Sequence, residues 1–99
     1  MRITEQQRKS MVEASTEIFG RNATIKLFGS RVDDSLRGGD IDLFIEINGV
    51  DPLKRKKARQ LISRIAAKLG YVLPIDVVCK DDNTVIERIH KEGMNGLSL

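Results

Sequence analysis

The stretch that decides the fold runs from residue 24 to residue 47 and reads TIKLFGSRVDDSLRGGDIDLFIEI. Two β-rich runs bound it, one at residues 23–28 and one at residues 41–47. The second run alternates isoleucine or leucine with acidic or aromatic side chains, which predicts a strand with one buried face and one face that carries acid. Because about ten residues join the two runs, we expect neighbouring antiparallel strands.

Helical patterns flank this pair of strands. Before it, residues 5–19 carry apolar side chains at helical spacing, and Thr4 and Gln7 have the spacing of a capping box. After it, the Asp-Pro pair at residues 51–52 predicts the N-cap and first turn of a basic helix, which Gly70 closes.

A third β-rich run, at residues 75–79, completes the expected sheet. Since a helix separates it from the strand at residues 41–47, these two strands are expected to be parallel, with a right-handed crossover. A short final helix is expected after a cap at residues 82–84. Three apolar side chains of that helix are expected to point inward: Val85, Ile86 and Ile89. The chain, residues 1–99, is thus expected to form one α/β domain with a small mixed sheet of at least three strands flanked by helices.

Acidic residues gather where the strands of this topology meet. The end of the first strand and the starts of the second and third share one edge of the sheet. Asp40 and Asp42 are two residues apart and therefore lie on one strand face, where their repulsion is costly without a cation. Asp76 interrupts an apolar strand and also needs a partner. We therefore expect a magnesium site with two ions, in which Asp40, Asp42 and Asp76 are both metal ligands and catalytic residues.

A phosphate-binding segment is expected opposite these carboxylates. Gly29 lets the backbone approach a phosphate closely, and Ser30 offers an N–H group and a hydroxyl group. Arg31 and Arg37 are expected to pair with the remaining phosphate charge. These four residues are the candidate nucleotide-binding residues.

The motifs resemble a known family. The segments at residues 28–31 (FGSR) and 39–43 (GDIDL), together with Asp76, are similar to the DNA polymerase beta-like nucleotidyltransferase superfamily. They most closely resemble its minimal, MNT-type domains, which are often paired with HEPN-domain proteins in toxin–antitoxin systems. The resemblance implies that Gly29 and Ser30 hold a triphosphate and that the three aspartates bind two magnesium ions. Members of this kind act as antitoxins, by binding the toxin and in some cases by transferring AMP to it.

The resemblance implies magnesium-dependent transfer of a nucleoside monophosphate, AMP from ATP, to a hydroxyl of a HEPN partner protein. Two alternatives stay open. One is a non-catalytic nucleotide-binding antitoxin that masks a HEPN ribonuclease. The other is a nucleic-acid-binding module that uses the helix at residues 54–68, which carries seven Lys or Arg and no acid. Residues 32–34 (VDD) depart from the Ala-Arg-Gly that is common in the family, so Arg37 is the candidate to supply the missing arginine.

The composition bounds the cellular setting. The longest apolar run is far shorter than a membrane span, and the first residues lack the apolar core of a signal peptide. The single cysteine, Cys79, excludes an internal disulfide and favours the reducing cytoplasm. We expect Cys79 to be a small core residue and His90, the one histidine, to lie on the surface. The sequence is compatible with a homo-oligomer.

Overall fold

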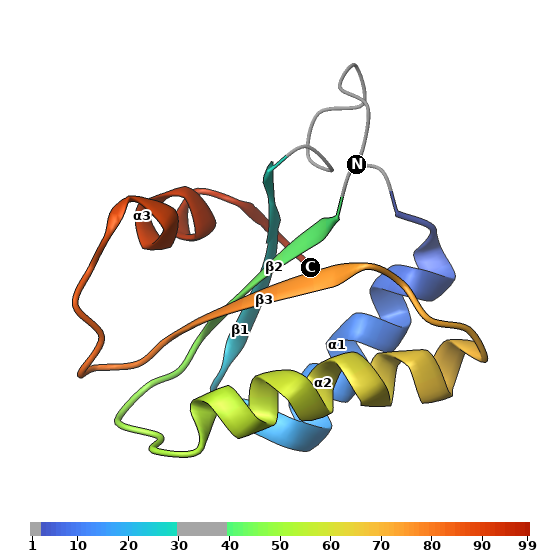
Figure 1. Ribbon diagram of the computed structural model, residues 1–99, viewed down its shortest axis with the longest axis horizontal. Helices are drawn as coiled ribbons and strands as arrows, with labels where there is room; N and C mark the ends of the chain where they lie inside the picture. Colours follow the sequence, from blue (N-terminus) through green and yellow to red (C-terminus); the bar gives the residue numbers. More distant parts are fainter. Residues whose placement is uncertain (1–2, 30–39) are drawn as a thin grey trace.

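The computed structural model of the protein describes residues 3–29 and 40–99 (Figure 1). In these ranges the elements are, in chain order, α1 Glu5–Phe19, β1 Thr24–Phe28, β2 Ile41–Glu46, α2 Lys54–Leu69, β3 Ile75–Lys80, α3 Arg88–Met94 and β4 Leu97–Ser98. The strands make one mixed sheet in the order β3-β2-β1-β4, with β2 parallel to β3 and β1 antiparallel to both β2 and β4. The expected α/β class and both expected strand directions are confirmed, whereas β4 is an addition to the prediction. No helix in the described ranges is both long and apolar enough to cross a membrane.

The first helix, α1, begins where the sequence predicts. The N–H of Gln7 donates to Thr4 Oγ1 at 3.1 Å, and the N–H of Thr4 donates to Gln7 Oε1 at 2.9 Å, so the capping box is complete. At the other end the helix stops at Gly20, whose N–H donates to the carbonyl of Thr16 at 3.0 Å. Both ends of α1 are therefore fixed by local sequence.

The second helix, α2, begins at Lys54, later than the sequence predicts. Asp51 Oδ1 accepts a hydrogen bond from the N–H of Leu53 at 2.9 Å, and the Asp51 carbonyl accepts one from the N–H of Lys54 at 3.2 Å. Asp51 thus shapes a turn ahead of the helix and does not cap it. Gly70 closes the helix as expected, in the left-handed region with a φ of 83°.

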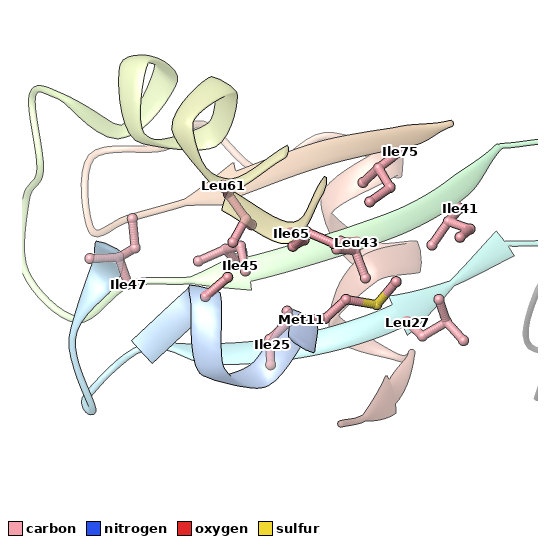
Figure 2. Packing of buried hydrophobic residues seen from close by; sticks show 11 residues of the cluster. Met11, Ile25, Leu27, Ile41, Leu43, Ile45, Ile47, Leu61, Ile65 and Ile75 are labelled. Atoms are coloured by element: carbon pink, nitrogen blue, oxygen red, sulfur yellow. The ribbon is translucent and has the colours of Figure 1, made fainter. Parts of the chain in front are cut away.

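The hydrophobic core lies between the sheet and the layer formed by α1 and α2 (Figure 2). Alternate residues of β2, Ile41, Leu43 and Ile45, are at most 1 % exposed. They meet Leu61 and Ile65 of α2, which confirms the alternation read from the sequence. Burial stabilises the fold by about 1.5–3 kcal/mol for each such side chain. Because a one-residue slip would expose all of them, this core fixes the register of β2.

The third helix, α3, covers part of the opposite face of the sheet (Figure 1). Gly93 is buried where α3 crosses β2, and a methyl group at this position would clash with the ring of Phe44. Phe44 in turn packs edge-on against Phe28, with ring centroids 6.5 Å apart. Lys26 of β1 donates to the carbonyl of Met94 at 2.7 Å. Glycine at position 93 therefore sets how closely α3 approaches the sheet.

The segment before α3 differs from the sequence prediction. Residues 82–84 do not cap the helix, because they bond back to Asp81: its Oδ1 accepts from the N–H of Asn83 at 3.0 Å and from Thr84 Oγ1 at 3.1 Å. The helix starts only at Arg88. The three apolar side chains that were expected to point inward are exposed, by 79 % for Val85, 40 % for Ile86 and 45 % for Ile89.

Candidate functional site

The acidic residues of β2 and β3 lie side by side at one end of the sheet. In the register of the sheet, Asp42 is opposite Phe28 of β1 on one side and opposite Asp76 of β3 on the other. Gly29 directly follows Phe28, and Asp40 precedes β2. As the sequence predicts, the end of β1 and the starts of β2 and β3 share one edge and bring these residues together.

Asp42 lies on the sheet face that points away from the main core. Its chain neighbours Ile41 and Leu43 are buried against the helices (Figure 2). The pleat of the strand therefore turns Asp42 toward the face that α3 partly covers. Asp42 is half-buried there, whereas Asp40 and Asp76 are exposed. The apolar packing on one face of β2 thus decides where the carboxylate on the other face stands.

The carboxyl groups of this cluster influence one another's protonation. Burial raises the pKa of Asp42, and repulsion from Asp76, Asp40 and Glu92 raises it further. The pKa of Asp76 is also raised, first by a hydrogen bond with Asp40 and then by burial and by the charge of Asp40. A cluster with raised carboxyl pKa values is unfavourable when every member is charged. A bound cation would remove that penalty, so the cluster has the chemistry of a cation site.

Gly29 brings the backbone of β1 directly against Asp42. Its φ of 77° lies in the left-handed region, where a side chain is strained. A Cβ atom at this position would also clash with Oδ2 of Asp42. Glycine is therefore required both by the local conformation and by the close approach to the carboxylate.

The other predicted nucleotide-binding residues, Ser30, Arg31 and Arg37, lie outside the described residues. Within residues 3–29 and 40–99, no group of three or more His, Cys, Asp or Glu side chains is arranged to hold a metal ion through protein ligands alone. Magnesium at sites of phosphoryl transfer commonly takes one or two carboxylates and completes its shell with water and substrate phosphates. The side-by-side pair of Asp42 and Asp76 offers that smaller donor set.

Glu92 of α3 lies near the acidic cluster, and the sequence prediction does not include it. Its charge contributes to the raised pKa of Asp42. Arg88, one turn earlier, holds it in an ion pair at 3.4 Å. The sequence signal is the following Gly93, whose missing side chain lets α3 rest on Phe44. From the sequence alone, Gly93 does not indicate that Glu92 lies near Asp42, because this depends on α3 crossing β2.

A pocket of about 470 Å³ lies beside β3. Residues 77–79, which follow Asp76 directly, line it together with parts of α2 and of the segment that leads into α3. Burial raises the pKa of the Cys79 thiol to about 11, so this cysteine stays protonated and unreactive at neutral pH. His90 also lines the pocket, where its Nδ1 accepts from the N–H of Glu87 at 2.9 Å, and it is less exposed than the sequence predicts.

The positive charge of α2 is largely neutralised within the molecule. Four of its seven basic side chains form ion pairs at 2.6 to 3.2 Å: Lys54 with Asp81, Lys57 with Asp51, and both Arg64 and Lys68 with Glu17. Three are exposed and form no ion pair with any residue that the structure describes: Arg55, Lys56 and Arg59. The uniformly basic surface that the sequence predicts is therefore reduced to this smaller group.

Comparison with known families agrees with the fold. The family model described as nucleotidyltransferase domain matches residues 6–95. This range extends from α1 to the end of α3 and includes Gly29, Asp40, Asp42 and Asp76. Neither a curated protein nor a solved structure matches the chain. Since the family model covers most of the sequence, the chain belongs to the nucleotidyltransferase domain family.

Proposed function

We propose that this domain catalyses the magnesium-dependent transfer of AMP from ATP to a hydroxyl group of a partner protein. Membership in the family supports nucleotidyl transfer in general. The observation that carries the finer proposal is the pairing of Asp42 with Asp76 across two parallel strands, with Asp40 directly ahead of β2. Three carboxylates thereby lie at the end of the sheet where Gly29 leaves the backbone close to Asp42.

The residues of the cluster fit magnesium. Their oxygen atoms are the hard ligands that this ion prefers. The pKa of Asp42 is raised first by burial and then by repulsion from the neighbouring carboxylates, and a divalent cation would offset that repulsion. We infer a site for two ions among Asp40, Asp42 and Asp76. Bound magnesium would neutralise the triphosphate and the charge that develops on the leaving group.

The side chains of the site would hold the nucleotide and accept a proton. Gly29, with Ser30, Arg31 and Arg37, would hold the triphosphate so that its α-phosphate faces the carboxylates. The acceptor oxygen would bond to the α-phosphorus while the bond from that phosphorus to the bridging oxygen breaks, and pyrophosphate would leave with the electron pair. The exposed carboxylate of Asp76 would take the hydroxyl proton and pass it to water.

A protein acceptor is supported by the charge distribution of α2. A nucleic-acid acceptor calls for many free cations along the binding surface. In the described residues only three of the seven basic side chains of α2 are free of ion pairs. We infer that the acceptor is a HEPN-class protein and that the domain acts as its antitoxin, an inference that rests on the resemblance of the FGSR and GDIDL motifs to MNT-type domains.

The first test is calorimetry of magnesium-ATP binding. Asp40→Asn and Asp42→Asn should each lower the affinity by more than about tenfold, since even outer partners of a metal site contribute that much. Asp82→Asn is the matched control, because Asp82 is exposed beyond the far end of β3, where its Oδ2 accepts from the N–H of Gly49 at 3.1 Å. Unchanged affinity in both site variants would remove the site assignment.

The second test is transfer to a partner. The domain is incubated with magnesium, labelled ATP and the product of the neighbouring gene, and both proteins are then weighed by mass spectrometry. Addition of one or more AMP units to the partner, lost with Asp40→Asn, would support the proposed function. A tight complex that silences a ribonuclease without any transfer would instead establish the non-catalytic antitoxin. Label found only on RNA ends would establish a nucleic-acid acceptor.

A further inference from the structure

The strand β3 has one open edge. Among the strands of residues 3–29 and 40–99, it lies at the end of the sheet order and has β2 on one side only. The carbonyls of Pro74 and Lys80 accept hydrogen bonds from the β2 side, each at 2.8 Å. By the alternation of a parallel ladder, the even-numbered residues of β3 face β2, and Val77 and Cys79 turn their backbone groups outward. In the described part of the chain these outward groups have no backbone partner.

The pocket of about 470 Å³ runs along this open edge. Val77 and Cys79 pack toward the core under α2, whereas Val78 points to the opposite face, yet all three line the pocket. The pocket therefore straddles the edge of the sheet. Figure 1 shows β3 between α2 on one side and α3 on the other. An open strand edge with a wall on each side is suited to accept one more extended segment through backbone hydrogen bonds.

The two walls of the pocket differ in chemistry. On the α2 wall, Arg55 is exposed and forms no ion pair with any described residue, while the adjacent Lys54 is neutralised by the buried Asp81 at 3.2 Å. The opposite wall is apolar at Val85, which is 79 % exposed, and also carries Glu87, whose side chain caps α3. Because side chains of a strand alternate between two faces, a bound segment would direct acidic side chains to Arg55 and apolar ones to Val85.

Asp76 lies at the start of the same strand. One residue adds about 3.3 Å along a strand, so the pocket floor at Val77 and Val78 begins within two residues of Asp76. We propose that the open edge of β3 binds an extended, acidic segment of the acceptor protein as an added strand, which brings a hydroxyl side chain of that segment beside Asp76. This inference rests on the proposed function, since it concerns the acceptor of the same reaction.

The test uses the complete chain labelled with ¹⁵N and saturated with magnesium-ATP. The probe is a peptide of about seven residues with capped termini, in which Glu and Val alternate around one Tyr. The control peptide has Lys in place of every Glu. The acidic peptide should slow hydrogen exchange of the Val77 and Cys79 amides by about tenfold or more, because these N–H groups gain acceptors. The lysine peptide should leave them unchanged. Mass spectrometry of the acidic peptide should show AMP on its tyrosine.

Two charge-reversed variants distinguish binding of the acidic peptide in the pocket from its nonspecific attraction to the basic surface of α2. Arg55 and Lys56 are neighbours on α2, are both exposed, and form no ion pair with a described residue, but only Arg55 lines the pocket. Arg55→Glu should weaken binding of the acidic peptide by about tenfold and allow binding of the lysine peptide. Lys56→Glu should change either affinity by less than about twofold.

Each contrary outcome has its own meaning. Unprotected Val77 and Cys79 amides at millimolar acidic peptide, with magnesium-ATP bound normally, would overturn the docking edge and leave the proposed function standing. Equal loss of affinity in both variants, with steep salt dependence, would also overturn it. Protection that appears without peptide and grows with protein concentration would assign the edge to a second copy of the chain. Protection by the peptide in a protein that binds no magnesium-ATP would support the docking edge and remove the proposed function.

Discussion

Asp42 lies between two neighbouring strands, so the position and the pKa of its carboxyl group depend on individual residues of other elements. Its carboxylate lies against Gly29, which follows β1, and beside Asp76 from β3, and Glu92 of α3 adds a further negative charge. The pKa of Asp42 is raised first by burial and then by this crowding of negative charges. Two substitutions test the arrangement at the scale of one residue.

Gly29→Ala is expected to reduce magnesium-ATP affinity strongly, because the added methyl group displaces the Asp42 carboxylate. Gly70→Ala is the matched control, since Gly70 also has a positive φ, 83°, but an added Cβ there meets nothing within 4 Å. Both variants should lose about 1–2 kcal/mol of stability from backbone strain. Calorimetry should show that only Gly29→Ala loses nucleotide binding, and equal binding by the two variants would contradict the role of Gly29.

Asp42→Asn is expected to raise the melting temperature of the metal-free protein by a few degrees, about 1–4 °C, at pH 7. The folded pKa of Asp42 is raised, so its contribution is most favourable below the unfolded pKa of about 3.9 and is lost as the pH rises through the folded pKa. The asparagine variant does not have this loss. Thermal unfolding in EDTA should show the difference at pH 7 and its disappearance near pH 3.5. A variant less stable than the parent at pH 7 would show that Asp42 is not repelled by its neighbours.

At the scale of elements, two contacts position the parts of the sheet around the site. α3 reaches β2 through Gly93 and Phe44. At the far end, Asp81 joins the turn after β3 to the turn before α2, accepting from the N–H of Asp51 at 3.0 Å and from Lys54 at 3.2 Å. Neither contact is local in sequence, and each has its own expected signature.

Gly93→Ala is expected to destabilise the protein by about 1–3 kcal/mol, the usual cost of an added methyl group in a packed contact. The methyl group would push α3 away from Phe44 and thereby move Glu92 away from Asp42. Met94→Ala, at a side chain that is 39 % exposed, should change stability by less than about 0.5 kcal/mol. Urea denaturation monitored by circular dichroism measures both. Equal effects would mean that α3 does not rest on Phe44 as described.

Asp81 is expected to control acid stability. Its pKa is lowered to about 2, first by the hydrogen bond from the N–H of Asp51 and also by Lys54. Since the unfolded pKa is about 3.9, its stabilising effect is present above that pH and is lost as the pH falls through about 2. Asp81→Asn should therefore melt several degrees below the parent at pH 7, with a gap that narrows toward pH 2. Asp82→Asn, at an exposed neighbouring carboxylate, should melt close to the parent at pH 7. Parallel profiles for Asp81→Asn and the parent would refute the role of Asp81.

At the scale of the whole molecule, the distribution of charge differs from what the net charge of +3 indicates. The acidic partners of α2 come from α1 and from two adjoining turns at one end of the sheet, so folding neutralises most of its basic face. Binding to nucleic acid is sensitive to this difference, because each contacted phosphate adds to the salt dependence.

If α2 contacts single-stranded RNA, its three free cations should give a slope of log affinity against log salt of about −2, since each contact contributes about −0.7. Seven free cations would give about −5. Fluorescence anisotropy of a labelled RNA of about fifteen nucleotides, titrated at KCl concentrations from about 50 to about 200 mM, would measure this slope. A slope of log affinity against log salt near about −5 would show that RNA breaks the internal ion pairs of α2. Nucleic acid would then replace the partner protein as the favoured acceptor.

Parts of the fold and of the site follow from short segments of the sequence alone. The capping box at Thr4 and the alternation along β2 are local patterns, and the structure confirms both. The spacing of Asp40 and Asp42, with Asp76 on the next strand, was enough to place these carboxylates at one edge of the sheet. A β-strand has a period of two, and parallel strands begin at the same end of a sheet. Local spacing therefore predicts the shared edge, and the packed core then sets the register that places Asp42 beside Asp76.

Other features exist only because distant segments meet. The two-residue strand β4 depends on β1 for its partner, and α3 begins late because Asp81 draws the preceding residues into a turn. The exposure of Val85 and Ile89, the neutralised charge of α2 and the open edge of β3 likewise depend on which elements become neighbours. Local sequence determined the types of the main elements and the face on which the acidic residues stand. Tertiary structure alone decided which charges are paired and which edge stays open, because ion pairing and edge exposure depend on contacts between residues that are far apart in the chain.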